Sequence, residues 1–184
     1  MIDIKLYLSE YRKTIFSDET VDKLHVLGEA LAEHKKRNKS VIIFGNGASA
    51  SIASHFALDM TKQGHLKTQC FHDPALLTAY ANDYGYDDCF KELVKSYSEE
   101  GQIAIFVSTS GESENVVKAQ QYARKNGLMT VSFTGRNEGN RLASASDISF
   151  WVDSHAYNIV ENTHSIWLMS LVDYLVGTAV YEVS

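Results

Sequence analysis

The chain has little proline, little cysteine and no long apolar run. Pro74 is the only proline in 184 residues, and Cys70 and Cys89 are the only cysteines. They are too far apart for a CxxC motif, and so few cysteines are typical of a reducing compartment. The first residues lack the apolar core of a signal peptide, and Asp173 interrupts the most apolar region before it reaches the length of a membrane span. The sequence therefore predicts a cytoplasmic protein with no membrane partner.

The chain also lacks an excess of positive charge. Its formal net charge is −6, which argues against a sequence-independent nucleic-acid binder and favours a small-molecule or protein partner. With 45% hydrophobic residues, the chain can form one domain with a full hydrophobic core, but it is too short for two domains that each have such a core. We therefore expect a single domain over residues 1–184, without repeats, low-complexity segments or linkers.

A short apolar run followed by a turn of glycines and serines organises the chain. Val41–Phe44 is β-branched or aromatic without a polar break, as in a strand buried on both faces of a parallel sheet. Gly45 and Gly47 allow a sharp turn, and Ser49 or Ser51 can cap the helix that follows. The N-terminus of such a helix presents N–H groups and a positive dipole end to an anion.

Strands and helices alternate along the rest of the chain. After the first helix, which ends near Lys62, we expect strands over Thr68–Phe71, Ile103–Val107, Met129–Phe133 and Ile148–Val152. Helices are expected over residues 75–81, 89–97, 114–125 and 158–181, with a turn at Asn82–Gly85. This alternation predicts an α/β fold with a three-layer, doubly wound, five-stranded parallel sheet of the flavodoxin-like kind.

Two helices with wide apolar stripes, Ile4–Phe16 and Glu19–Lys36, precede the first strand. They have little sheet left to cover, so one of them is expected to pack on another subunit. The alternative, a helix folded back on its own sheet, stays open. The terminal helix is expected to add further surplus apolar surface, which predicts a homotetramer. Its apolar residues are Ile166, Trp167, Leu171 and Leu175.

The first glycine loop fits two kinds of site. Gly45, Gly47 and Ala50 match the permissive GxGxxA form of the dinucleotide fingerprint, and Asp73 lies beyond the second strand. A nucleotide cofactor must therefore be weighed against a simple phosphate.

A second loop, at another junction between a strand and a helix, argues for the phosphate and against a nucleotide cofactor. It places four hydroxyls around Gly111, which suits a phosphate monoester better than a bridging pyrophosphate. If this loop is considered alone, the better interpretation is a turn rich in Ser and Thr with a helix N-cap. The hydroxyl residues are Ser108, Thr109, Ser110 and Ser113.

The two loops together resemble the sugar isomerase (SIS) fold, and more narrowly the bacterial phosphoheptose isomerases. These enzymes interconvert sedoheptulose 7-phosphate and a heptose phosphate for surface polysaccharide, including lipopolysaccharide, synthesis. The resemblance rests on GNGAS followed by HFALD, AND at residues 81–83, STSGES at 108–113, FTG at 133–135 and IVENTH at 159–164.

The resemblance implies a phosphorylated sugar as ligand and residues that bind it. The four hydroxyl residues of the second loop, Ser108, Thr109, Ser110 and Ser113, would hold the phosphate. Asn46, Gly47, Ser49, Asn82 and Asp83 would line the sugar site. The family is usually a homotetramer with sites between subunits, so residues 1–37 would serve oligomerisation and residues 38–184 would form the α/β phosphosugar-binding core.

Two pairs of ionisable residues have helical spacing. His55 and Asp59 lie four residues apart, and Glu161 and His164 lie three apart. The pairs could converge on one divalent metal such as zinc, with His55, Asp59 and Glu161 as ligands, or Asp59, Glu161 and His164 could act as acid and base. Alternatively, the carboxylates are solvated and His164 is a hydrogen-bonded interior residue.

One departure from the family's pattern puts catalysis in question. Members commonly carry His then Glu at the positions of His55 and Asp59, Gln or Glu at Glu161, and a catalytic His eight residues later. Here that residue is Met169, expected to face the same pocket. A thioether cannot transfer a proton and is a poor ligand for a hard cation. Two hypotheses remain: an isomerase with a relocated base, or a non-catalytic phosphosugar-binding regulator or scaffold, like the relative that binds the bacterial replication initiator.

Overall fold

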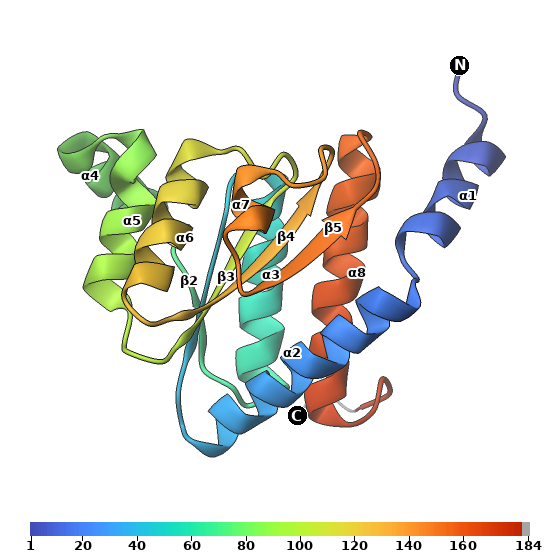
Figure 1. Cartoon of the computed structure of the whole chain (residues 1–184). Helices are drawn as coiled ribbons and strands as arrows, with labels where there is room; N and C mark the ends of the chain where they lie inside the picture. The colour runs from blue at the N-terminus through green and yellow to red at the C-terminus, as the bar shows by residue number, and fades with distance from the viewer. Residues whose placement is uncertain (182–184) are drawn as a thin grey trace.

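The computed structural model describes residues 1–181 and contains one parallel sheet with helices on both faces (Figure 1). The strand order is β2-β1-β3-β4-β5, and every neighbouring pair is parallel. The strands are β1 (Val41–Gly45), β2 (Thr68–Cys70), β3 (Ile103–Ser108), β4 (Met129–Gly135) and β5 (Ile148–Val152). This arrangement confirms the predicted doubly wound five-stranded sheet.

Alternate residues of β1 show how the two core layers form. Val41 and Ile43 belong to the hydrophobic cluster under α2 (Asp18–Lys36), α3 (Ala48–Lys62) and α8 (Tyr157–Val176). Ile42 and Phe44 belong to the cluster under α5 (Tyr86–Tyr97), α6 (Glu114–Lys125) and α7 (Arg141–Ser144). Because successive side chains of a strand point to opposite faces, an unbroken apolar strand supplies both layers.

The two N-terminal helices behave differently. In α2, Leu27 and Leu31 are fully buried against the protein's own core, so this helix folds back on its own sheet. Helix α1 (Ile4–Thr14) projects away from the sheet (Figure 1). It has no buried residue and exposes Ile4 and Leu6. It remains the candidate for packing on another subunit, and the oligomeric state remains a prediction.

Helix α8 holds the start of the chain by polar contacts. The indole Nε1 of Trp167 donates to the main-chain oxygen of Ile15 at 2.8 Å, and the hydroxyls of Thr163 and Thr14 lie 3.1 Å apart. Trp167 and Leu171 are nearly fully buried in the core, whereas Ile166 is exposed. The prediction that this whole apolar face is surplus was therefore wrong, because most of it covers the sheet.

Several element boundaries differ from the prediction. Helix α4 (Pro74–Tyr84) continues through Asn82 and Asp83, where a turn was expected, and ends at Gly85, whose φ is 80°. Helix α8 stops before Gly177, which has the left-handed conformation typical of a helix C-terminus, and not near residue 181. Helix α7 was not predicted, because four residues are too short to show a period.

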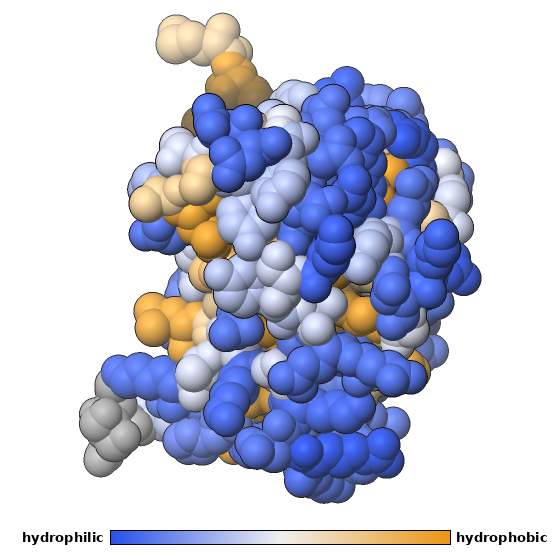
Figure 2. Space-filling model, turned by 90° about the vertical axis from the view of Figure 1, so that its left-hand side faces the viewer, coloured by the Kyte–Doolittle hydropathy of each residue, from blue (hydrophilic) through white to orange (hydrophobic). Residues whose placement is uncertain are grey.

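The helices and one face of the surface can be compared with what a membrane span would require. Within residues 1–181, no helix is long and apolar enough to cross a membrane. Figure 2 views the side of the molecule on which α4 and α5 lie, and this surface is mostly hydrophilic with scattered hydrophobic residues. Both cysteines are free.

Candidate active site

The loops after β1 and β3 meet where the strand order of the sheet reverses. Gly45 at the end of β1 pairs with Val107 near the end of β3. In open α/β sheets, ligands bind outside the carboxyl ends of the strands at such a switch point. A cavity of about 170 Å³ lies there. It is lined by Asn46, Ser49, Val107, Ser108, Thr109, Ser110, Ser113, Tyr157 and Glu161.

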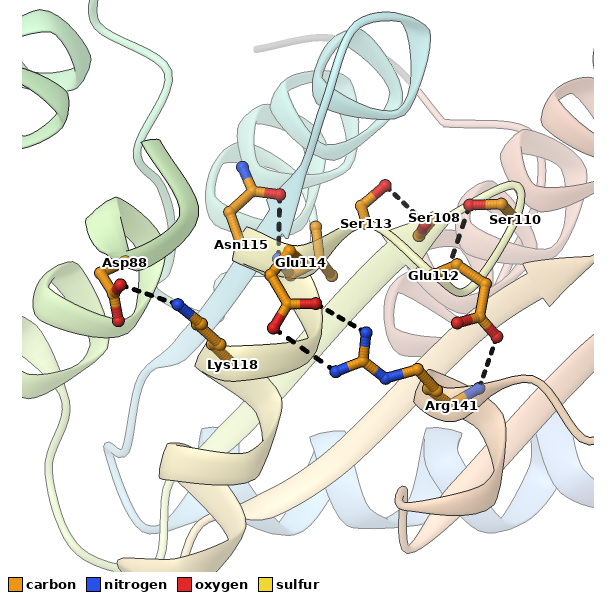
Figure 3. Close-up of polar contacts among 10 residues, drawn as sticks. Asp88, Ser108, Ser110, Glu112, Ser113, Glu114, Asn115, Lys118 and Arg141 are labelled. Carbon is orange, nitrogen blue, oxygen red and sulfur yellow. Dashed lines mark hydrogen bonds and ion pairs between the residues drawn. The ribbon is translucent and has the colours of Figure 1, made fainter. Parts of the chain in front are cut away.

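The second loop, residues 108–113, is called the serine loop below, and hydrogen bonds within it close it (Figure 3). The hydroxyl of Ser108 lies 3.3 Å from that of Ser113 and accepts the N–H of Gly111 at 3.2 Å. Gly111 has a φ of 67°, and a Cβ atom there would lie 1.9 Å from Oδ1 of Asn140. Only glycine fits this turn without displacing Asn140, so the loop's shape is fixed before any ligand arrives.

Two helices begin at the cavity without a side-chain cap. Gly47 is the N-cap of α3 and Ser113 is that of α6, and neither helix has a side-chain hydrogen bond at its cap. The predicted capping by Ser49 or Ser51 was therefore wrong. In α6 the N–H of Val116 donates to Oδ1 of Asn115 at 3.0 Å. A helix start without an N-cap side-chain bond can receive an anion at its remaining free N–H groups. With the loop's hydroxyls, this arrangement suits a phosphate monoester.

Asn46 is held by a buried partner that sequence reasoning missed. Its Nδ2 donates to Oδ1 of Asn115 at 2.9 Å, and Nδ2 of Asn115 donates back to Oδ1 of Asn46 at 3.1 Å. The hydroxyl of Tyr86 donates to the same Oδ1 of Asn46 at 2.9 Å. Both acceptor positions of that oxygen are therefore filled, so Asn46 can offer a ligand only its remaining N–H.

Helix α8 brings a carboxylate to the opposite wall of the cavity. Glu161 lies one turn after Tyr157, and its Oε1 accepts from the hydroxyl of Thr109 at 3.4 Å. Tyr157 in turn accepts from the guanidinium of Arg136 at 2.9 Å. Within the described chain, Glu161 is the only carboxylate that lines the cavity. The structure thus places one candidate base beside the predicted phosphate site.

Other predicted site residues lie outside this cavity. His55 and Asp59 share a face of α3 as expected, with His55 Nε2 at 3.0 Å from Asp59 Oδ2, but neither lines the cavity. Asn82 and Asp83 are exposed on the last turn of α4, and Gly47 contributes the turn rather than the wall. Among the predicted binding residues, only Asn46, Ser49 and the four hydroxyl residues of the serine loop line it.

The predicted metal ligands are not brought together in the described chain. Within residues 1–181, no group of three or more His, Cys, Asp or Glu side chains is placed to hold a metal ion. His55 and Asp59 pair with each other, and Glu161 lies at the cavity with Thr109. A zinc site normally needs at least three protein ligands. The residues of a single chain therefore do not fit a resident metal at this position.

His164 cannot serve as the predicted proton carrier in this arrangement. It is fully buried between Phe133 and Trp167, and its Nε2 lies 2.9 Å from the main-chain oxygen of Thr134. The carbonyl can only accept, so Nε2 carries the proton. Burial lowers the pKa of His164 to about 4. The alternative given by the sequence, a hydrogen-bonded interior histidine, matches the structure.

Met169 does not line the cavity either. It is half-buried and packs against the core cluster under α3 and α8. Eight residues advance a helix by about 12 Å along its axis, so the rotation that relates Met169 to Glu161 does not bring it to the same opening. The expectation that Met169 faces this pocket was therefore wrong.

The structure accounts for Asp73 without a nucleotide. Asp73 is the N-cap of α4, and its Oδ1 accepts the N–H of Leu76 at 3.0 Å. The carboxylate that a dinucleotide fingerprint needs for a ribose is thus used as a helix cap.

Two tyrosines at the site, Tyr157 and Tyr86, were not predicted from the sequence. An exposed tyrosine carries no spacing signal of its own, and only the fold brings these two to the loops.

Comparison with known proteins identifies the family of this chain. The SIS domain family profile matches residues 7–135. The phosphoheptose isomerase of Thermodesulfovibrio yellowstonii is 36% identical over 177 residues, which cover 93% of this chain and 87% of the relative. That of Fusobacterium nucleatum is 32% identical over 178 residues, which cover 92% and 91%.

Solved structures share the fold. Phosphoheptose isomerase GmhA from Neisseria gonorrhoeae matches with a TM-score of 0.85 at 24% identity, over 95% of this chain and 97% of that one. The phosphoheptose isomerase from Francisella tularensis matches with a TM-score of 0.81 at 25% identity, over 95% and 98%. The chain therefore belongs to the SIS domain family and, within it, to the phosphoheptose isomerases.

Proposed function

We propose that this protein isomerises sedoheptulose 7-phosphate, or a closely similar ketose phosphate, for heptose and surface polysaccharide synthesis. The observation that carries the proposal is the position of Glu161 across a small cavity from the serine loop. A phosphate held by the hydroxyls and the two helix starts would place the sugar carbons along the cavity wall. The family membership set out above supports the same reaction.

Aldose–ketose isomerisation needs one base that moves a proton between two carbons. In the ketose, the base removes a proton from C1 as O2 gains one, which gives an enediol. Returning the carbon-bound proton to C2 while O1 loses its proton gives the aldose. Glu161 is the candidate base, and Thr109 orients its carboxylate by donating a hydrogen bond. Asp59 remains a second proposed base, supplied from another subunit of the proposed homotetramer, because it does not reach the cavity of its own chain.

The alternative is a protein that binds the phosphosugar without turnover and regulates or organises a partner. Met169 favours it, because a thioether stands where the family carries its catalytic histidine. Glu161 favours the isomerase, because a binding protein has no need of a carboxylate beside a phosphate dianion. We place the isomerase first for that reason.

Exchange of substrate hydrogen with deuterated solvent separates the two. The wild type should exchange a C1 hydrogen of sedoheptulose 7-phosphate, and any aldose formed should carry deuterium at C2, since the enediol forms even when net conversion is small. Glu161→Gln should reduce the exchange rate by about 10²-fold or more while binding is retained. Asp173→Asn, on the same helix but outside the cavity, serves as the control. Wild-type binding without any exchange, also with other six- and seven-carbon ketose phosphates, would establish the binding protein instead.

A further inference from the structure

Two carboxylates, one within the serine loop and one directly after it, should repel a phosphate. Glu112 lies inside the loop and Glu114 is the first residue of α6, immediately after Ser113. Among the described residues that line the cavity there is no lysine or arginine. A sugar phosphate carries close to two negative charges at neutral pH, so unpaired carboxylates this close would weaken its binding.

Both carboxylates are held by one residue of α7, Arg141 (Figure 3). The Nη1 and Nη2 atoms of Arg141 donate to the two carboxylate oxygens of Glu114 at 2.6 and 3.5 Å. The main-chain N–H of Arg141 donates to Oε1 of Glu112 at 3.0 Å. In Figure 3 both glutamate side chains point toward Arg141, on the opposite side of the loop from the Ser113 hydroxyl.

Another nearby cation, Lys118, is paired with a different carboxylate. Lys118, one turn further along α6, donates to Asp88 at 2.8 Å, and Asp88 also accepts from Lys91 at 2.6 Å. Arg141 therefore provides the direct counter-charge of Glu114, and the hydrogen bond from Arg141 lowers the pKa of Glu114. Glu114 therefore stays ionised at neutral pH. Its repulsion of an anionic ligand is offset by the ion pair with Arg141 and not by protonation.

We propose that Arg141 is a positioning residue for the substrate phosphate, because its guanidinium neutralises Glu114 and holds that carboxylate away from the serine loop. This inference rests on the proposed binding of a sugar phosphate at the loop. Arg141 itself does not line the cavity, so its effect on the ligand is exerted through Glu114. The ion pair thus allows a dianion to bind at the loop without repulsion from Glu114.

Binding and turnover of sedoheptulose 7-phosphate by four variants test this inference. Arg141→Met should raise Kd and KM about 3- to 10-fold at low ionic strength and leave kcat unchanged, because an unpaired carboxylate then faces the dianion. Arg141→Lys should restore most of the affinity. The double variant Arg141→Met with Glu114→Gln should return to within about 2-fold of the wild type, because the repelling charge is gone. Arg37→Met, which breaks the remote Arg37–Glu33 ion pair of α2, is the control that removes the same charge.

Salt separates an electrostatic role from a structural one. In about 0.5 M salt the penalty of Arg141→Met should shrink to less than about 2-fold, because exposed charges are then screened within a few ångströms. A penalty independent of salt, or a double variant as weak as Arg141→Met, would refute the inference and leave a merely structural ion pair. An unchanged Kd in Arg141→Met would refute it as well. A wild type that binds no sugar phosphate would instead refute the proposed function, and this inference with it.

Discussion

The Nε2 atom of His164 lies 2.9 Å from the main-chain oxygen of Thr134, which joins α8 to the end of β4. The bond fixes the proton on Nε2, and Nδ1 is buried without a partner in the described chain. Protonation of Nδ1 would place a charge in the core between two aromatic rings. This histidine therefore stabilises the fold only in its neutral form.

Acid should destabilise the protein through His164. Its pKa is about 4 in the folded state, below the usual value of 6.5, so the unfolded state binds the extra proton between these values. Stability is then complete well above pH 6.5 and falls as the pH is lowered toward 4, by about 1.5 kcal/mol between pH 6.5 and 5. Urea unfolding at a series of pH values measures this slope.

The variant His164→Gln isolates the effect. Glutamine keeps a donor for the main-chain oxygen of Thr134 but does not titrate. The free energy of unfolding of the variant should therefore change less between pH 6.5 and 5 than that of the wild type. His72, whose pKa is also lowered by burial, contributes in the same direction in both proteins. Equal slopes in the two proteins would show that His164 does not titrate across this range.

Removing one hydroxyl of the serine loop should weaken ligand binding without unfolding the protein. Ser113→Ala deletes a donor to a charged acceptor, which costs about 1.5–3 kcal/mol, or about 10- to 100-fold in Kd. Calorimetry with sedoheptulose 7-phosphate measures the change. Ser170→Ala, whose hydroxyl donates only to the main chain of α8, is the matched control. An affinity equal to the wild type would place the phosphate elsewhere.

Gly111→Ala should destabilise the protein more than Gly127→Ala, because a Cβ atom has room at Gly127 but not at Gly111. Both Gly111 and Gly127 have positive φ, 67° and 77°, but only Gly111 lacks room for a Cβ because of Asn140. Gly127→Ala should cost about 1–2 kcal/mol for the backbone conformation alone. Gly111→Ala should cost more and should also raise Kd, since the loop must shift. Thermal unfolding of both variants gives the comparison, and similar losses would mean that Asn140 moves aside freely.

Histidine at position 169 should not change proton exchange greatly if Glu161 is the base. Met169 packs on the core cluster and outside the cavity that Glu161 lines, so Met169→His adds an imidazole outside that cavity. Solvent deuterium exchange should therefore stay near the wild-type rate. An increase of about 10²-fold or more, alone or with Asp59→Glu, would show that the family's proton carrier has been lost here and can be restored.

The sheet was predictable because its signal is local. Ile103–Val107 is apolar without a break, and the order of strands and helices alone indicates a parallel sheet. The serine loop was predictable for the same reason, since all its hydroxyls lie within six consecutive residues. Helix ends were less predictable where glycine alone decided them, as at Gly85 and Gly177.

The rest of the site was not predictable from spacing. Glu161 and His164 lie three residues apart, so they were expected on one face, yet about 60° of rotation separates the cavity from the core. Asn115 and Arg141 act on residues 69 and 27 positions away in the chain. Such partners are set by how helices pack on the sheet, which a sequence pattern does not specify.

The parallel order of the strands also governs when the site can exist during synthesis. Parallel neighbours cannot be joined by tight turns, so no strand pair forms from a local hairpin. The cavity needs Asn46 from the first loop and Glu161 from the last helix, and that helix also anchors the start of the chain through Trp167 and Ile15. A nascent chain that ends before α8 therefore carries a phosphate loop without its carboxylate, and the complete site forms only after α8 has been synthesised.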